Sequence, residues 1–168
     1  MPNEPTIVDR PEQPYVAIEG TVGLTTFGEI ADRLPEVFAF LGRRGIAPAG
    51  PPFFRYLEID METHLVVQAG VPVAEPLDGE GDLLAAALPS GRYVSYVHTG
   101  HPDQLFDVTD RVLGWADQEG LTWDRIPGED GERWGCRLEI LHTDPAQEPD
   151  LDKWVTELAF RLTPAQPS

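Results

Sequence analysis

A carboxylate stands in the middle of an apolar segment that runs from Trp134 to Pro145. β-forming residues alternate along this segment until Asp144-Pro145, which predicts a strand over residues 134–142. A period of two places Glu139 on one face with Arg137 and Leu141. The other face is predicted to carry Trp134, Cys136, Leu138, Ile140 and His142. Because an unpaired buried charge is costly, Glu139 is either solvated or buried for a functional reason.

Two interpretations of Glu139 follow from its surroundings. Arg137 lies two residues away on the same face, and a weak surface ion pair would explain both side chains. If Glu139 is instead buried without a partner, desolvation raises its pKa and a bound cation would supply the missing charge. A carboxylate of that kind could also orient or deprotonate a water molecule as a general base.

Aromatic side chains could form the walls of such a site, with cation–π contacts of about 0.5–2 kcal/mol each. The candidates are Phe54, Tyr56, Tyr96, Trp115, Trp123, Trp134 and Trp154. Tyr56 or Tyr96 could in addition donate a proton to a leaving group. Ordinary core packing is the alternative for each, and Trp123, expected in a connector, could cover the core or line a pocket.

Glu157 is the second candidate carboxylate for the ligand-binding cleft and lies in the middle of the strand predicted over residues 154–162. Its face also carries Val155, Ala159 and Arg161, so we expect it to be paired or solvated. Glu58, on the predicted face of Tyr56, is a weaker third candidate.

The sequence indicates no metal site and no cofactor. His98 and His101 are three residues apart across a strand-to-helix junction, and no third ligand follows at metal-site spacing. Nucleophile elbows, phosphate loops and dinucleotide fingerprints are also absent from the sequence.

Composition restricts the possible partners. The chain has 168 residues with 29 acidic and 12 basic side chains, for a net charge of −17. This charge argues against a nucleic-acid-binding surface and permits a cationic ligand. Cys136 is the single cysteine, so no internal disulfide forms, and we expect it to be a buried apolar residue. No membrane-length apolar run or signal peptide is present, which predicts a soluble cytoplasmic protein.

Pattern and punctuation predict many short elements. Helices are expected after Thr26, with a break at Pro35 and an end at Gly45, and from Pro102 to an end at Gly120. The expected strands, apart from the two given above, cover residues 13–22, 53–59, 64–73, 83–88 and 92–98.

The order strand, helix, strand, strand therefore occurs twice, in repeats of about 15–73 and 83–162. This duplication predicts an α+β fold with an antiparallel sheet and both helices on one face. The opposite face is expected to curve around a ligand at the pseudo-twofold interface. We predict a flexible arm over 1–14, one domain over 15–163, and a tail over 164–168.

Four motifs occur in order along nearly the whole chain, from about Tyr15 to Leu162. They are Gly50-Pro-Pro-Phe-Phe-Arg-Tyr56, Ala69-Gly-Val-Pro-Val73, Leu88-Pro-Ser-Gly-Arg-Tyr93 through His98-Thr-Gly100, and Leu138-Glu-Ile-Leu-His-Thr-Asp-Pro145. Together they resemble the GyrI-like small-molecule-binding domain, which also serves as the effector-binding module of multidrug-responsive bacterial transcription regulators.

The resemblance implies a duplicated βαββ fold whose central cleft takes lipophilic, often cationic compounds, with an acidic residue at its floor in the position of Glu139. The chain resembles the stand-alone members, some of which are similar to hydrolases that open cyclopropane rings using the Glu and an aromatic residue. Two departures argue against catalysis here. Leu141 stands where the family commonly has an aromatic residue, and Gly100-His-Pro-Asp103 replaces a common Gly-Pro-Tyr.

Three hypotheses for function result. The first is binding or sequestration of lipophilic, cationic small molecules, with Glu139 as the charge complement. The second is a hydrolase acting on strained electrophiles, with Glu139 as base. The third is a ligand-sensing subunit of a transcription regulator, which requires a DNA-binding partner. The sequence does not define the oligomeric state.

Overall fold

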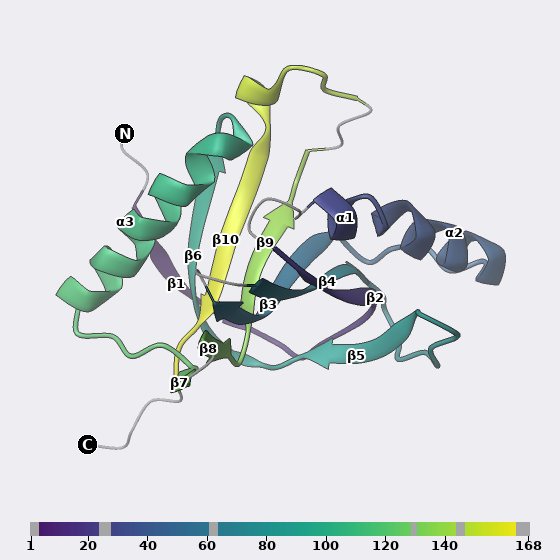
Figure 1. The fold of residues 1–168 in the computed structure, drawn as a ribbon, viewed down its shortest axis with the longest axis horizontal. Coiled ribbons are helices and arrows are strands. Elements are labelled where there is room, and N and C mark those ends of the chain that lie inside the picture. Colours follow the sequence, from purple (N-terminus) through teal and green to yellow (C-terminus); the bar gives the residue numbers. More distant parts are fainter. Residues whose placement is uncertain (1–3, 24–27, 61–63, 129–130, 144–146, 164–168) are drawn as a thin grey trace.

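The computed structural model describes residues 4–23, 28–60, 64–128, 131–143 and 147–163. Their fold is an antiparallel sheet with helices on one face (Figure 1). The strands on the main path are β1 (Thr6–Arg10), β2 (Gln13–Val22), β3 (Phe53–Asp60), β4 (His64–Pro72), β5 (Leu84–Leu88), β6 (Gly91–Thr99), β9 (Arg137–Leu141) and β10 (Val155–Arg161). Their order in the sheet is β1-β6-β10-β9-β3-β4-β2-β5.

This strand order confirms the α+β fold and the duplication. Read outward from the centre, one half is β3-β4-β2-β5 and the other is β9-β10-β6-β1. Each half contains the unit strand, helix, strand, strand, and β3 pairs with β9 where the halves meet. The central seam therefore lies between two strands that are remote in sequence.

The predicted flexible arm over 1–14 is wrong for its central part. Thr6–Arg10 forms β1, which pairs with β6 and occupies the edge position that β5 occupies in the other half. Ile7 and Val8 lie opposite Val94 and Tyr93, so the strand is stabilised by residues about 86 positions further along the chain. The predicted tail over 164–168 lies outside the described residues.

The helices begin and end close to where the punctuation predicts. α1 (Gly28–Ala31) and α2 (Leu34–Arg44) are separate, with Pro35 in the first turn of α2. Short 3-10 helices cover Pro102–Gln104 and Leu151–Lys153. The longer helix α3 (Leu105–Gln118) follows directly after the first of them. None of the described helices is long and apolar enough to cross a membrane.

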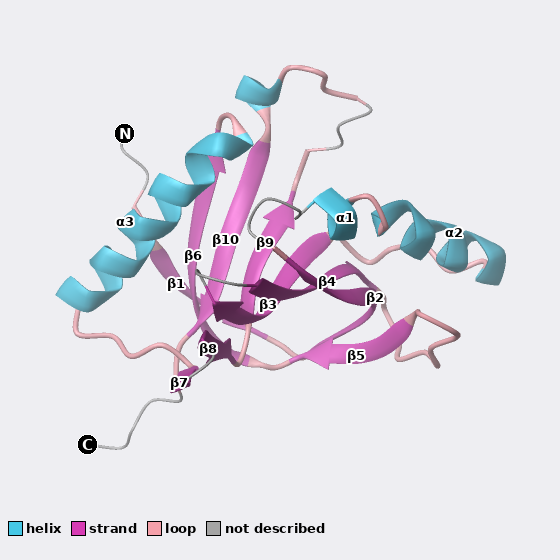
Figure 2. Cartoon of the chain, in the orientation of Figure 1, coloured by secondary structure: helices cyan, strands magenta, loops and turns pink. Residues whose placement is uncertain are grey.

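α2 and α3 pack on the same face of the sheet, here called the helix-bearing face. Val37 and Phe40 of α2 and Val108 and Val112 of α3 belong to one core cluster with the strand residues beneath them. Figure 2 shows α3 on one side and α1 and α2 on the other, with β10, β9 and β3 between them. The two longer helices therefore lie on one face of the sheet, as predicted.

The other face of the sheet, here called the far face, carries a second apolar cluster. Its buried residues include Tyr15, Phe53, Leu138 and Cys136. Cys136 is fully buried, as predicted, and burial raises the pKa of its thiol. Buried apolar side chains therefore pack on both faces of the central strands.

The strand predicted over residues 134–142 is interrupted. β8 (Gly131–Trp134), which forms a hairpin with β7 (Arg125–Gly128), ends before Gly135, and β9 begins at Arg137. The connector that we expect around Trp123 therefore contains β7 and contributes to the sheet. The break moves Trp134 into the helix-bearing cluster, while Cys136 stays on the far face, so the predicted sharing of a face by these two residues is wrong.

Gly135 lies at the break and packs against Asp124. Its N–H donates to the Asp124 carbonyl at 2.8 Å, and a Cβ atom there would meet the Asp124 carboxylate unless that side chain moved. β3 also contains a bulge. The register shifts between Tyr56 and Glu58, so Glu58 lies opposite Val66 and leaves the face of Tyr56.

The glycine that ends α2 gives a test of the fold. Gly45 has φ 68°, a left-handed conformation, and its N–H closes the helix end. We expect Gly45→Ala to lower the free energy of unfolding by about 1 kcal/mol. The matched control is Gly42→Ala within α2, where a Cβ meets nothing within 4 Å. That change should instead raise it by about 0.5–1 kcal/mol in urea denaturation. Equal effects at both positions would contradict this assignment.

Candidate functional site

Glu139 is positioned by the central strand of the sheet on the helix-bearing face. In the register it lies opposite Leu158 of β10 and Phe54 of β3. Leu158 is 0% exposed and Phe54 6% exposed, whereas Glu139 itself is half-buried. The carboxylate therefore lies between two apolar neighbours, and this burial raises its pKa.

Two groups act against this burial penalty. The side chain of Tyr56 forms a hydrogen bond with Glu139 that lowers the carboxyl pKa, and the positive charge of Arg137 lowers it further. The net pKa of Glu139 remains raised. Burial and the neighbouring carboxylate raise the pKa of Tyr56 well above its usual value, so its hydroxyl keeps its proton and donates it to the hydrogen bond.

Arg137 is held by aromatic rings. Its guanidinium carbon lies 4.7 Å from the ring centre of Phe160 and 4.8 Å from that of Trp134, with Tyr56 at 5.9 Å. Burial lowers the pKa of Arg137, while the nearby Tyr56 and Glu139 act against this shift. Among the described residues no salt bridge joins Arg137 to Glu139, so the predicted surface ion pair is not the arrangement found.

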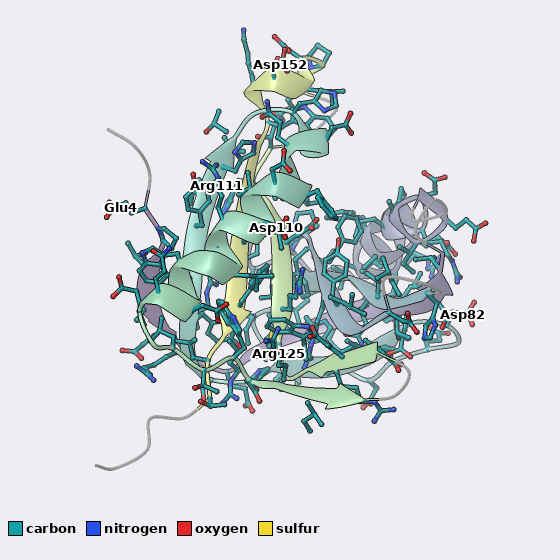
Figure 3. All side chains as sticks on the ribbon, turned by 60° about the vertical axis from the view of Figure 1, so that its left-hand side comes forward. Glu4, Asp82, Asp110, Arg111, Arg125 and Asp152 are labelled. Atoms are coloured by element: carbon teal, nitrogen blue, oxygen red, sulfur yellow. The ribbon has the colours of Figure 1, made fainter. Side chains whose placement is uncertain are left out.

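The predicted aromatic residues divide into two groups. Tyr56 and Phe54 lie near Glu139. Tyr96 is opposite Leu158, which is itself opposite Glu139, so Tyr96 belongs to the same row of residues across the sheet. Tyr96 and Trp115 are half-buried against the helix-bearing cluster. Arg111 of α3, labelled in Figure 3, lies 6.0 Å from the ring centre of Tyr96.

The other three tryptophans, Trp123, Trp134 and Trp154, have contacts that stabilise the fold. Trp123 and Trp134 are each 4% exposed and pack on Phe160 with ring centres 5.8 and 5.7 Å away, which is core packing. Trp154 is half-buried, and its indole Nε1 donates to the carbonyl of Glu148 at 2.8 Å. Trp154 thereby ties down the loop before β10.

We expect from the sequence that the ligand binds on the face opposite the helices, but Glu139 does not lie on that face. Glu139 shares the helix-bearing face with Arg137, Tyr56 and Phe160. The alternation along β9 places Leu138 and Ile140, and not Glu139, on the far face. The helices leave this carboxylate accessible because they pack toward the two ends of the sheet, on β2 and β4 or on β6.

Glu157 lies on the far face and is paired, as predicted, although not with the residues of its own strand. Its Oε2 accepts from Nη2 of Arg10 and from Oγ of Ser95, each at 2.6 Å. Its Oε1 lies 2.9 Å from Nε2 of His142. Burial acts to raise the pKa of Glu157, but these three partners lower it below its usual value.

We did not predict from the sequence that Arg10 pairs with Glu157, or that aromatic rings surround Arg137 beside Glu139. Arg10 is 147 residues from Glu157, in the segment expected to be an arm. The aromatic surroundings of Arg137 depend on Phe160 and on the break at Gly135. Neither has a local signal, because both arise from pairing between distant strands.

The two histidines considered as metal ligands have other contacts. His98 Nε2 lies 3.0 Å from Oε1 of Gln104, and His101 Nδ1 accepts from the backbone N–H of Asp103 at 3.0 Å. The described part of the chain contains no group of three or more His, Cys, Asp or Glu that could hold a metal ion.

The two carboxylates should change stability with pH in opposite directions. The folded-state pKa of Glu139 is raised, so its stabilisation is present at low pH and lost as the pH rises through that pKa. The folded-state pKa of Glu157 is lowered, so its stabilisation is present near neutrality and lost as the pH falls through that pKa.

We therefore expect Glu139→Gln to become more stable relative to the unmodified chain as the pH rises from about 4 to about 8. Glu157→Gln should become less stable over the same range. Urea unfolding at several pH values measures both, and each variant is the control for the other. Stability differences that run in the same direction would contradict the two environments described here.

Comparisons with known proteins agree with this architecture. The sequence matches the family described as "GyrI-like small molecule binding domain" over residues 3–163. The comparison with curated proteins finds no match.

Solved structures with the same fold include the EcmrR C-terminal domain, with 15% identity and a TM-score of 0.73 over 98% of this chain and 100% of that one. SAV2435 bound to tetraphenylphosphonium has 11% identity and a TM-score of 0.60, covering 95% and 94%. A hydrolase from Listeria innocua has 12% identity and a TM-score of 0.61, covering 95% and 92%. The chain spans 58% of the length of EcmrR in its complex with DNA, with 16% identity, a TM-score of 0.75 and 97% of this chain covered.

Proposed function

This chain belongs to the GyrI-like small-molecule-binding domain family, and on that premise we propose that it binds lipophilic cations around Glu139 on the helix-bearing face. One observation carries the choice of a cation. The Glu139 carboxylate lies between apolar neighbours with a raised pKa, and among the described residues it has a hydrogen bond to Tyr56 but no salt bridge.

A cationic ligand would relieve the cost of this buried charge. Ionised Glu139 loses hydration without gaining a direct ionic partner, and a cation that displaces the remaining water supplies one. Removing one member of a buried charge pair costs about 2–5 kcal/mol, so the electrostatic contribution to affinity is large. The half-buried rings of Tyr56, Tyr96 and Trp115 add apolar area and cation–π attraction.

Arg137 is compatible with this proposal because its charge is already engaged. Its guanidinium lies over the rings of Trp134 and Phe160. The net charge of −17 further concentrates cations near the chain. SAV2435, which has the same fold, is bound to tetraphenylphosphonium, and this supports that lipophilic cation as the first probe.

Tetraphenylphosphonium should bind the unmodified chain, and Glu139→Gln should weaken its binding at least tenfold, about 1.4 kcal/mol, because the variant lacks the negative charge. Triphenylphosphine oxide, a neutral compound of similar shape, should bind the two proteins equally. Isothermal titration calorimetry measures all four affinities.

Glu157→Gln is the matched control, since it removes a carboxylate on the far face and should leave tetraphenylphosphonium binding unchanged. Equal weakening of the cation and the neutral compound by Glu139→Gln would remove the electrostatic basis of the proposal.

Hydrolysis of a strained electrophile is the second candidate. The hydrogen bond between Tyr56 and Glu139 favours it, because it orients a carboxylate that could take a proton from water. A hydrolase from Listeria innocua has the same fold, which supports testing this chain for hydrolysis. The raised pKa of Tyr56 makes its hydroxyl a weak acid, which leaves Tyr96 as the donor to the leaving group.

Catalysis predicts ring-opened product when the chain is incubated with a cyclopropane-containing alkylating agent, followed by chromatography and mass spectrometry. Glu139→Gln should abolish product formation, because water then lacks its base, while Glu157→Gln should retain it. Tight binding of the agent with no product above the rate in buffer would reject hydrolysis and leave the binding function.

A further inference from the structure

A cavity of about 190 Å³ lies on the far face of the sheet, away from Glu139. Its apolar walls include Phe53, Leu138 and Ile140, which belong to the two central strands. Leu138 and Ile140 alternate with Glu139 along β9, so the sheet itself separates the cavity from the site on the helix-bearing face. The function proposed for Glu139 gives this cavity no role.

Three of the residues that line the cavity are polar and joined to one another. Glu157 is held by Arg10 at 2.6 Å and by His142 at 2.9 Å, and its side chain is only 12% exposed. The charges of Arg10 and Glu157 compensate each other. A ligand in this cavity therefore meets no net charge from this pair, which favours a neutral compound over an ion.

His142 offers an acceptor to such a compound. A carboxylate can only accept, so the ring nitrogen Nε2 that faces Glu157 carries the proton, and in the neutral imidazole Nδ1 has a lone pair. Within the described part of the chain Nδ1 has no hydrogen-bond partner, and the side chain is 37% exposed.

The nearby arginine does not add a donor through its Nε atom. That atom has no hydrogen-bond partner among the described residues, but it is buried with almost no accessible surface, and Nη2 of Arg10 is engaged by Glu157 at 2.6 Å. A single hydroxyl that donates to His142 therefore matches the polar end of the cavity. The volume agrees with a small ligand, since an apolar cavity of about 150 Å³ holds one benzene ring.

We propose that this far-face cavity is a second small-molecule site, which takes neutral single-ring compounds with a hydroxyl group, of the phenol class. The ring lies against Phe53, Leu138 and Ile140, and the hydroxyl donates to Nδ1 of His142. The site is separate from the cation site at Glu139 and does not depend on it.

The test is a titration of the full-length chain with p-cresol, followed by amide chemical shifts in nuclear magnetic resonance. Saturable shifts should appear at Ile140 and His142. Toluene has the same ring without the hydroxyl and should bind about fivefold more weakly, the loss of about one hydrogen bond. 4-Methylbenzoate, which carries a negative charge, should also bind more weakly, because the paired Arg10 and Glu157 offer no net charge to offset its loss of hydration.

A blocking variant locates the binding. Gly50 lines the cavity, and a Cβ there meets only Cγ of Pro72 at 3.5 Å, an ordinary contact, so Gly50→Leu should fill the space without straining the fold. It should abolish p-cresol binding and leave tetraphenylphosphonium affinity unchanged. Gly42→Leu, on α2 in open space, is the matched control and should keep both. Urea unfolding of each variant verifies that it is folded.

His142→Phe tests the polar contact and should reduce p-cresol affinity to that of toluene. The proposal is overturned if p-cresol produces no saturable shifts, if toluene binds as tightly, or if folded Gly50→Leu still binds p-cresol. Loss of p-cresol binding in Glu139→Gln would place the compound on the helix-bearing face and overturn it as well. Failure of tetraphenylphosphonium to bind would bear only on the function proposed for Glu139.

Discussion

The need to accommodate a carboxylate at the seam between two halves of a sheet dominates this structure. Glu139 lies on β9, where that strand pairs with β3, and both of its lateral neighbours are buried apolar side chains. A helix packed directly over this point would bury the charge completely, at a cost that one tyrosine hydrogen bond does not offset. The helices instead lie toward the two ends of the sheet. The position that is hardest to cover is thereby left available to a ligand.

The same sheet treats its two central carboxylates in contrasting ways. Glu157 on the far face has three hydrogen-bonding partners, two of which are basic side chains, and its pKa is lowered. Glu139 has one uncharged hydrogen-bond partner, and its pKa is raised. The nearby cation, Arg137, is stacked on aromatic rings and contributes only through its longer-range charge. The fully paired carboxylate therefore organises structure, whereas the under-compensated one retains a capacity to bind.

Duplication explains how a chain of this size obtains two usable faces. Each half supplies four strands to the main path of the sheet, with α1 and α2 in the first half and α3 in the second, and the N-terminal β1 completes the second half as β5 completes the first. Because the helices cover one face only, the apolar residues of the other face must be sheltered by strands and loops. That shelter is incomplete around Ile140 and Glu157, where the cavity lies.

The sequence by itself determined the features that depend on near neighbours. Alternation defined most strands, Gly45 and Gly120 marked the helix ends, and the duplicated order predicted one sheet with both helices on one face. It also singled out Glu139, because a charge flanked by Leu138 and Ile140 is visible along the chain. Only the tertiary structure decided what each charge contacts. Arg10 reaches Glu157 across 147 residues, and Trp134, which ends β8 just before the break, lies against Arg137 of β9. Those outcomes depend on strand pairing and side-chain packing between distant segments, which local periodicity does not encode.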